Sequence, residues 1–344
     1  METIAGIEVE PVTAWLVRHV DLVAPLHFEL IAGGRSNLTY RVTDATGRSV
    51  ALRRPPVSHV LPTAHDMVRE HTVIAALAPL GVPVAHPLGL CTDESTTDRP
   101  FYVMEFVDGA ILRNRDQAEL AFDESVRATI GDHLAQTLAR LHDVDVDRAG
   151  LADLARHDGY IERQLRRWRT QYEQTRVDGV DDHGAIEAIG ERLARNIPRQ
   201  QRTSVVHGDY RLDNTVLDEK GDVLAILDWE ICTLGDPLAD LGILLVYWAE
   251  PHDETVALLG AAPTSAPGFA SRADVLESYA RHSNLDLSDV TYYQAFGYWK
   301  LACILQGVYA RYQAGATAGD QGSVLDFPTH ITTLATLAGR TLET

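Results

Sequence analysis

Short hydrophobic runs separated by Gly, Pro and Asp fill the first 107 residues of the chain, a pattern typical of strands. The predicted strands lie at residues 28–31, 38–42, 49–56 and 101–107. Two helices accompany them, a short one at 11–20 and a second at 65–77, where apolar residues recur on one helical face. The sequence therefore predicts a small sheet with helices beside it.

From residue 108 onward the hydrophobic spacing becomes helical. The predicted helices lie at residues 123–142, 159–169, 186–197, 272–282 and 292–314. Residues 205–227 are the exception, because a short apolar run is followed by two strands, 215–217 and 223–227, that a polar turn closes. The second part is thus predicted to be mainly helical, with one small β-element.

Composition excludes several classes of partner. Among 344 residues, 45% are hydrophobic and 23% are charged, which is ordinary for a globular protein. The net charge of −19 argues against DNA, RNA and anionic membranes as partners, because these bind positive surfaces. The three cysteines have neither paired nor metal-ligand spacing, and no signal peptide or membrane-spanning run is found. We expect a cytoplasmic protein whose oligomeric state the sequence does not reveal.

Candidate chemistry concentrates in the β-element. His207-Gly208-Asp209 follows the apolar run, and Asn214 comes five residues after Asp209. Asp228 stands at the end of the second strand. A phosphoryl-transfer site needs a carboxylate near the acceptor hydroxyl, and further oxygen ligands that hold magnesium on the nucleotide phosphates. These residues supply both, although an acidic turn in an ordinary α/β domain is the plainer alternative.

The spacing His-x-Asp-x-x-x-x-Asn followed by an Asp resembles the catalytic and metal-binding loops of protein kinases. His-Gly-Asp, with Ile226-Leu227-Asp228-Trp229-Glu230, is more similar to the aminoglycoside phosphotransferase and choline kinase family. Leu52-Arg53-Arg54-Pro55-Pro56, after Gly33-Gly34-Arg35-Ser36-Asn37, resembles a subgroup that includes kinase-like domains fused to acyl-CoA dehydrogenases. The resemblance implies a two-lobed protein-kinase-like fold of the α+β class. Its N-lobe, an antiparallel sheet plus helix, is expected at 1–107, and its mainly helical C-lobe at 108–344.

The resemblance also implies roles for the C-lobe residues. Asp209 orients and deprotonates the acceptor hydroxyl, and His207 packs and hydrogen-bonds under the loop. Asn214 and Asp228 hold Mg²⁺ on ATP. Asp240, which lies in a second motif similar to the family, supports the catalytic loop through hydrogen bonds.

Other residues are implied to bind the nucleotide. The phosphates are covered by the loop that contains Gly33, Gly34, Ser36 and Asn37, and the adenine lies against backbone groups near Glu105 and Val107. Glycines allow backbone N–H groups to approach an anion. The residues alone leave two plainer alternatives open, a hairpin turn for the glycine pair and one more core strand for 101–107.

The cation that grips the phosphates is expected to be Arg53, with Arg54 as the second choice. Kinases use a lysine at this place, but this chain has only Lys220 and Lys300, and neither is placed for the phosphates. Arginine can grip phosphate oxygens with two N–H groups at once. Glu70, in the middle of the predicted helix, is implied to pair with Arg53. A solvated arginine and a surface glutamate are the alternatives.

Several acceptors are compatible with these residues. We favour a metabolic kinase acting on a small-molecule hydroxyl such as that of a hydroxyacyl-CoA, as the acyl-CoA dehydrogenase-fused relatives suggest. The alternatives are an aminoglycoside antibiotic phosphotransferase, a choline- or homoserine-type kinase, and a nucleotide-binding pseudokinase. An acidic cleft lined by carboxylates would favour an aminoglycoside, because it must neutralise several ammonium groups, and a long apolar groove with arginines would favour an acyl-CoA.

Overall fold

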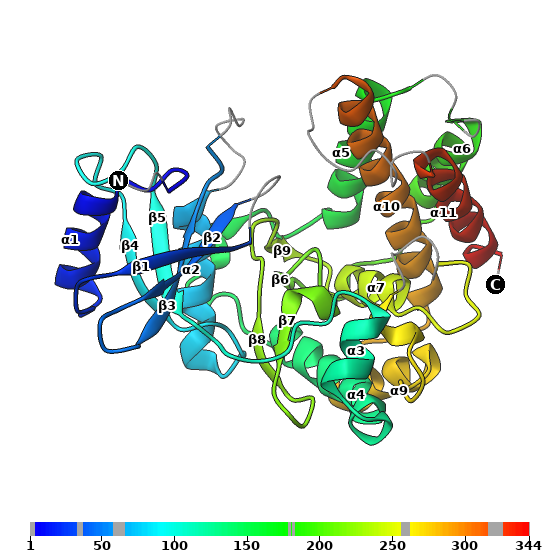
Figure 1. The fold of residues 1–344 in the computed structure, drawn as a ribbon. Helices are drawn as coiled ribbons and strands as arrows, with labels where there is room; N and C mark the ends of the chain where they lie inside the picture. The colour runs from blue at the N-terminus through cyan, green and yellow to red at the C-terminus, as the bar shows by residue number, and fades with distance from the viewer. Residues whose placement is uncertain are drawn as a thin grey trace. The chain divides into compact units, whose positions relative to one another are not determined.

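The computed structural model describes residues 4–32, 37–57, 66–177, 180, 183–255, 262–315 and 326–343. The chain forms two compact units. The first comprises Met1–Gly109 together with Val223–Cys232, and the second comprises Ala110–Asp222 together with Thr233–Thr344. Figure 1 shows the first unit mostly in blue and cyan and the second mostly in green to red.

The first unit is built on a five-stranded sheet (Figure 1). Its strands are β1 (His27–Ala32), β2 (Leu38–Thr43), β3 (Ser49–Arg54), β4 (Pro87–Cys91) and β5 (Phe101–Glu105). They run in the order β1-β2-β3-β5-β4, and all neighbours are antiparallel. The helices α1 (Val9–His19) and α2 (Met67–Leu77) belong to the same unit, followed by the 3₁₀ turn η1 (Ala78–Leu80). The predicted antiparallel sheet plus helix is confirmed.

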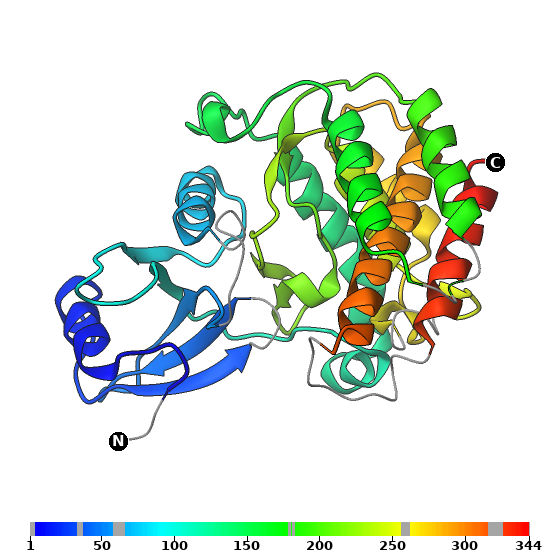
Figure 2. The same cartoon turned by 90° about the horizontal axis from the view of Figure 1, so that it is seen from above.

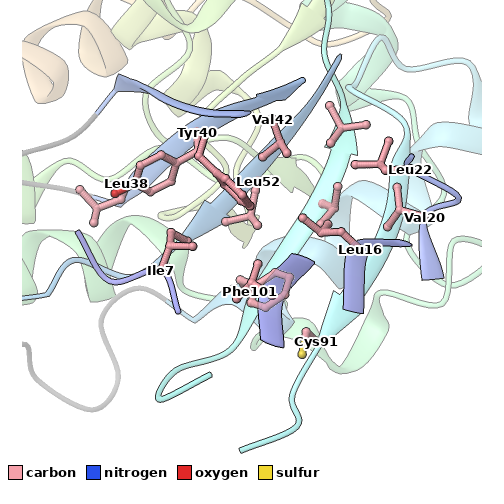
Figure 3. Close-up of a cluster of buried hydrophobic side chains, with 14 residues drawn as sticks. Ile7, Leu16, Val20, Leu22, Leu38, Tyr40, Val42, Leu52, Cys91 and Phe101 are labelled. Carbon is pink, nitrogen blue, oxygen red and sulfur yellow. The ribbon is translucent and has the colours of Figure 1, made fainter. Parts of the chain in front are cut away.

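The two faces of this sheet differ in chemistry, because successive side chains of a strand point to opposite faces. On one face, Val12 and Leu16 of α1 join Tyr40, Leu52 and Phe101 in a buried apolar cluster (Figure 3). The residues between these on the strands point to the other face, which α2 approaches through β4 and β5. That second face carries polar groups and forms part of the candidate site.

The segment Val223–Cys232 belongs to the first unit, although the division expected from the sequence placed it after residue 107. It contains β8 (Val223–Ile226). The backbone N–H of Ile226 donates to the carbonyl of Pro83 at 2.8 Å, and Arg69 donates to the carbonyl of Cys232 at 3.0 Å. These long-range bonds are not visible in local sequence patterns, and they attach the segment to the sheet unit.

The second unit is mainly helical. Its helices are α3 (Arg115–Ala121), α4 (Glu124–His142), α5 (Tyr160–Gln174), α6 (His183–Arg195), α7 (Leu238–Tyr247), α9 (Arg272–His282), α10 (Val290–Gln313) and α11 (Phe327–Thr341). Its short elements are β6 (Ser204–Val206), β7 (Thr215–Leu217), β9 (Thr233–Gly235), η2 (Ala152–Leu154), η3 (Leu212–Asn214) and η4 (Pro263–Ser265). The five helices predicted for this part are present, and α7 begins directly after Asp236-Pro237, which the sequence also indicates as a helix start. Helices α3 and α11 were not predicted.

Helix α10 is the centre of the second unit. It packs against α5, α6, α7 and α11, and Figure 2 shows it in orange among the green α5 and α6 and the red α11. Most residues of α7 and α10 are buried, which fits the strongly apolar sequence of 241–248. None of the helices in the described part of the chain combines the length and apolar character that a membrane span requires.

Candidate active site

Arg53 is the centre of a polar cluster on the second face of the sheet. The strand register places it between Thr39 on β2 and Tyr102 on β5. Only 9% of the surface of Arg53 is exposed. The guanidinium Nε donates to Glu70 at 2.9 Å, Nη1 donates to Thr39 Oγ1 at 3.3 Å, and Nη2 donates to Asp228. The guanidinium is therefore held from three sides.

Glu70 of α2 is the buried anchor of this cluster, with 1% of the residue exposed. Besides the Arg53 bond, its carboxylate accepts from the Tyr102 hydroxyl at 3.0 Å and from Asn37 Nδ2 at 2.8 Å. Burial raises the pKa of Glu70, and the charge of Arg53 opposes that rise. The pair of Glu70 with Arg53, implied by the resemblance, is present in the structure.

Asp228 lies in a left-handed backbone conformation, with φ of 64°. Aspartate tolerates this region better than most residues, but a non-glycine residue there is often at a functional site. Glu230 adds a second carboxylate, 3.9 Å from Arg53 Nη2 and within hydrogen-bond distance of Asn37, at 3.3 Å. Burial acts to lower the pKa of Arg53, but the charges around it, Glu70 first, raise the pKa on balance.

Arg54, the second choice for the phosphate cation, lies elsewhere. Its neighbour Arg53 takes the polar face, so the alternation of the strand directs Arg54 away from that face. Arg54 is 1% exposed, donates to Asp98 at 3.1 Å, and would clash with any side chain at Gly6. Among the two arginines, only Arg53 joins the cluster with Glu70 and Asp228.

The loop that follows β6 carries the second group of candidate residues. Gly208 has φ of 88°, a conformation that favours glycine. The backbone N–H groups of His207 and Gly208 donate to the two carboxylate oxygens of Asp240, at 2.6 and 2.7 Å. His207 is fully buried, and its Nδ1 accepts from the Asp209 N–H at 3.3 Å. The hydrogen bonds expected from Asp240 and the packing expected of His207 are present.

Asp209 and Asn214 meet across this loop. Asn214 Nδ2 donates to the Asp209 carbonyl at 2.9 Å and to its Oδ2 at 3.0 Å. Both bonds use the NH₂ group of the amide, so its oxygen is not a partner in either of them. An amide oxygen and a carboxylate are hard oxygen ligands of the kind that Mg²⁺ prefers, so Asn214 in the second unit and Asp228 in the first each carry a suitable ligand group. The described residues contain no group of three or more His, Cys, Asp or Glu that could hold a metal by themselves.

The structure adds three residues that sequence reasoning missed. Tyr102 donates to Glu70. Arg211 lies beside the loop, with Nε 3.3 Å from Asp209 Oδ2, Nη1 3.1 Å from Asp213 and its guanidinium over the Tyr247 ring. Lys300 of α10 donates to the Gly208 carbonyl at 2.7 Å. Arg211 could have been noted from its place two residues after Asp209, but nothing in the sequence links residue 300 to this loop.

The other residues expected to bind the nucleotide lie in the loop at 33–37 and near residue 105. Gly33, Gly34 and Ser36 lie outside the described residues, whereas Asn37 is buried beside Glu70 and Glu230. The N–H of Glu105 donates to the carbonyl of His86 at 2.8 Å, so that donor is already used. Arg53, Glu70 and Asp228 come together in the first unit, and His207, Asp209 and Asn214 come together in the second.

We expect Asp240→Asn to destabilise the protein by about 1–3 kcal/mol, the cost of leaving a buried donor unsatisfied. Burial raises the pKa of Asp240, but hydrogen bonds and nearby histidines outweigh this, so the pKa is lowered. The stability from this carboxylate is therefore fully present above its unfolded pKa of about 4, and it is lost progressively as the pH falls from there through the lowered pKa of the folded state. Denaturant unfolding at pH 7 measures the loss. The surface variant Asp143→Asn, which only weakens an exposed pair with Arg202, should change stability by less than about 0.5 kcal/mol; equal losses would contradict the prediction.

Comparison with known proteins identifies the family of this chain. Residues 27–273 match the phosphotransferase enzyme family, APH. The chain belongs to this family. Among relatives of this phosphotransferase, acyl-CoA dehydrogenase family member 10 of Mus musculus is 36% identical over 312 residues, or 85% of this chain and 28% of that protein. Member 11 of Rattus norvegicus is 33% identical over 322 residues, or 91% of this chain and 41% of that protein.

The phosphotransferase chain thus spans between 28% and 41% of the length of these two curated relatives. A crystal structure of a Ralstonia eutropha JMP134 protein, named provisionally as an aminoglycoside phosphotransferase, matches over 98% of both chains. It is 31% identical, with a TM-score of 0.80. These comparisons confirm the family predicted from the His207–Glu230 motifs, and they confirm its fold class. They also confirm the resemblance to the subgroup that includes kinase-like domains fused to acyl-CoA dehydrogenases.

Proposed function

We propose that the chain is an ATP- and Mg²⁺-dependent phosphotransferase that phosphorylates a hydroxyl group of a small molecule. The observation that carries this proposal is the contact of Arg53 with both Glu70 and Asp228. A buried arginine tied to a helix carboxylate supplies what a kinase lysine supplies, a fixed cation for the nucleotide phosphates. The lack of a lysine at this place therefore does not argue for a pseudokinase.

Catalysis in such a site is positioning and charge neutralisation. Asp209 orients the acceptor hydroxyl and accepts its proton, while His207 and Asp240 keep the loop backbone in place. Asn214 and Asp228 are the proposed Mg²⁺ ligands, and the bound ion would neutralise charge on the phosphates. We assign phosphate covering to the loop with Gly33, Gly34, Ser36 and Asn37, and adenine binding to the Glu105 carbonyl and the Val107 N–H. We keep 1–107 as the nucleotide lobe and 108–344 as the acceptor lobe.

A small pocket lies beside the catalytic loop, with a volume of about 30 Å³. It is lined by Arg113, Arg211, Leu212, Asp213, Leu244, Tyr247, Trp248, Ala262, Pro263 and Thr264. Arg211 in this lining is paired with Asp209 and Asp213, so these two carboxylates balance the charges of the two arginines and the lining does not repel a cationic acceptor. A hydroxyacyl-CoA is proposed because relatives of this chain are named as acyl-CoA dehydrogenase family members. The aminoglycoside stays the alternative, since the Ralstonia relative carries that name.

We expect Mg²⁺-dependent consumption of ATP with one class in a panel of 3-hydroxyacyl-CoAs, choline, homoserine and kanamycin. Turnover with the hydroxyacyl-CoAs, absent in Asp209→Asn, is the predicted outcome. Turnover with kanamycin instead would overturn the acceptor class but keep the kinase. A chain that binds Mg²⁺-ATP and transfers phosphate to none of the panel, nor to water, is the outcome expected of a pseudokinase. A chain that binds no nucleotide would remove the proposed function.

A further inference from the structure

The buried lysine under the catalytic loop has no role in the site described so far. Lys300 lies on α10 and is only 5% exposed. Its Nζ donates to the carbonyl of Gly208 at 2.7 Å, and lies 5.7 Å from the centre of the Trp168 ring on α5. Burial lowers the pKa of Lys300, whereas the charges of Asp209 and Asp240 act to raise it.

A lysine is a costly way to fill this position. Burying an ammonium removes it from water, and an apolar side chain of similar volume often packs as well or better. Leu301, Ala302 and Cys303, the next residues of α10, are buried and carry no charge. The charge at 300 therefore contributes something other than packing, and its partner, the Gly208 carbonyl, indicates what that is.

Three consecutive peptide groups of the loop each form hydrogen bonds with side chains. Asp240 takes the N–H groups of His207 and Gly208. The next peptide, between Gly208 and Asp209, is held at both ends. Lys300 donates to its carbonyl, and His207 Nδ1 accepts from its N–H. Because Gly208 has no side chain and a left-handed backbone, the bonds to Lys300 and His207 restrain the rotation of this peptide.

Rotation of that peptide would swing the Cα–Cβ bond of Asp209, and with it the carboxylate. A misplacement of about 1 Å in a catalytic group can cost about 10² in rate. We propose that Lys300 is a positioning residue for the base: its ammonium fixes the Gly208–Asp209 peptide and so directs the Asp209 carboxylate toward the acceptor. This inference rests on the proposed function, since it takes Asp209 as the base.

The experiment compares wild type with Lys300→Met, Lys300→Arg and the control Lys220→Met, which removes the only other lysine, in the exposed turn at 218–222. The readouts are kcat and KM of Mg²⁺-ATP hydrolysis with water as acceptor, deuterium uptake of a peptide covering 204–214, and Tm. Lys300→Met should lower kcat by about 10- to 100-fold while KM for ATP stays within about twofold. Uptake in 204–214 should quicken. Lys300→Arg should recover part of kcat, and Lys220→Met should match wild type.

A fall in Tm with unchanged kcat and unchanged uptake in 204–214 would show that Lys300 is only structural. If the Met variant fails to fold, the same prediction applies to Lys300→Gln. The glutamine side chain is one bond shorter than that of lysine and carries no charge. Failure of the proposed function looks different: wild type itself would neither bind nor hydrolyse ATP. Wild-type activity with an equally active Lys300→Met would overturn the inference alone.

Discussion

Asp209→Asn should lose about 10²–10⁴ in turnover, the usual contribution of a general base. The amide has nearly the same shape, so it should keep the loop in place, but it cannot accept the hydroxyl proton. The affinity for Mg²⁺-ATP should change little, because Asp209 is assigned to the acceptor. Single-turnover kinetics for the chemical step and calorimetry for nucleotide binding separate the two effects.

Asp213→Asn is the matched comparison, since Asp213 also contacts Arg211, at 3.1 Å, and is four residues away on the same loop. It removes an equal charge without removing the base. Its turnover should stay within about tenfold of wild type, because the variant removes a neighbouring charge and leaves the base at 209 in place. Equal losses in both variants would mean that the charge around Arg211, and not a base at 209, controls the rate.

Asp228→Ala should abolish measurable binding of Mg²⁺-ATP, a loss of at least about 100-fold in affinity or about 2.7 kcal/mol. The variant removes a proposed Mg²⁺ ligand and one of the carboxylates that hold Arg53. Titration calorimetry with and without Mg²⁺ measures the loss.

Asp222→Ala serves as the control, because Asp222 lies in the turn before β8 with a half-exposed side chain and is not part of the site. It should bind Mg²⁺-ATP like wild type. Retention of Mg²⁺-dependent affinity in Asp228→Ala would remove Asp228 from the metal site, although Arg53 and Glu70 could still hold the phosphates.

The sheet, most helices and the Arg53–Glu70 pair could be predicted from the sequence. Each depends on a local signal: short apolar runs for strands, helical spacing for α4 and α9, and motifs of the resembled family for the pair. Glu70 lies on a helix that the spacing of its apolar residues predicts. Arg53 and Arg54 are neighbours on a strand, so their side chains point to opposite faces of the sheet, and the strand register shows which one lies on the polar face. Arg53 contacts Glu70 and Asp228 because Leu52, its neighbour on the strand, takes the apolar face.

The parts that were missed depend on contacts between distant residues or on weak local signals. The bond from Lys300 to Gly208 joins residues 92 positions apart. Helix α11 is rich in threonine, which favours helices weakly, and it is stabilised by packing on α10. Helix α3 has only seven residues. The attachment of residues 223–232 to the sheet unit needs the Ile226–Pro83 backbone bond, which no periodicity reveals.

Helices α1 and α10 both lie outside the stretch of the chain that the family model matches. The stretch recognisable as a phosphotransferase covers residues 27–273, yet Val12 and Leu16 of α1 precede it and complete the apolar face under Leu52. Lys300, which holds the catalytic loop, follows it. A chain trimmed to 27–273 would keep every motif residue and lose both supports. The stretch that the family model matches is therefore shorter than the unit that must fold, and exchange of this module between proteins should preserve its flanks as well as its motifs.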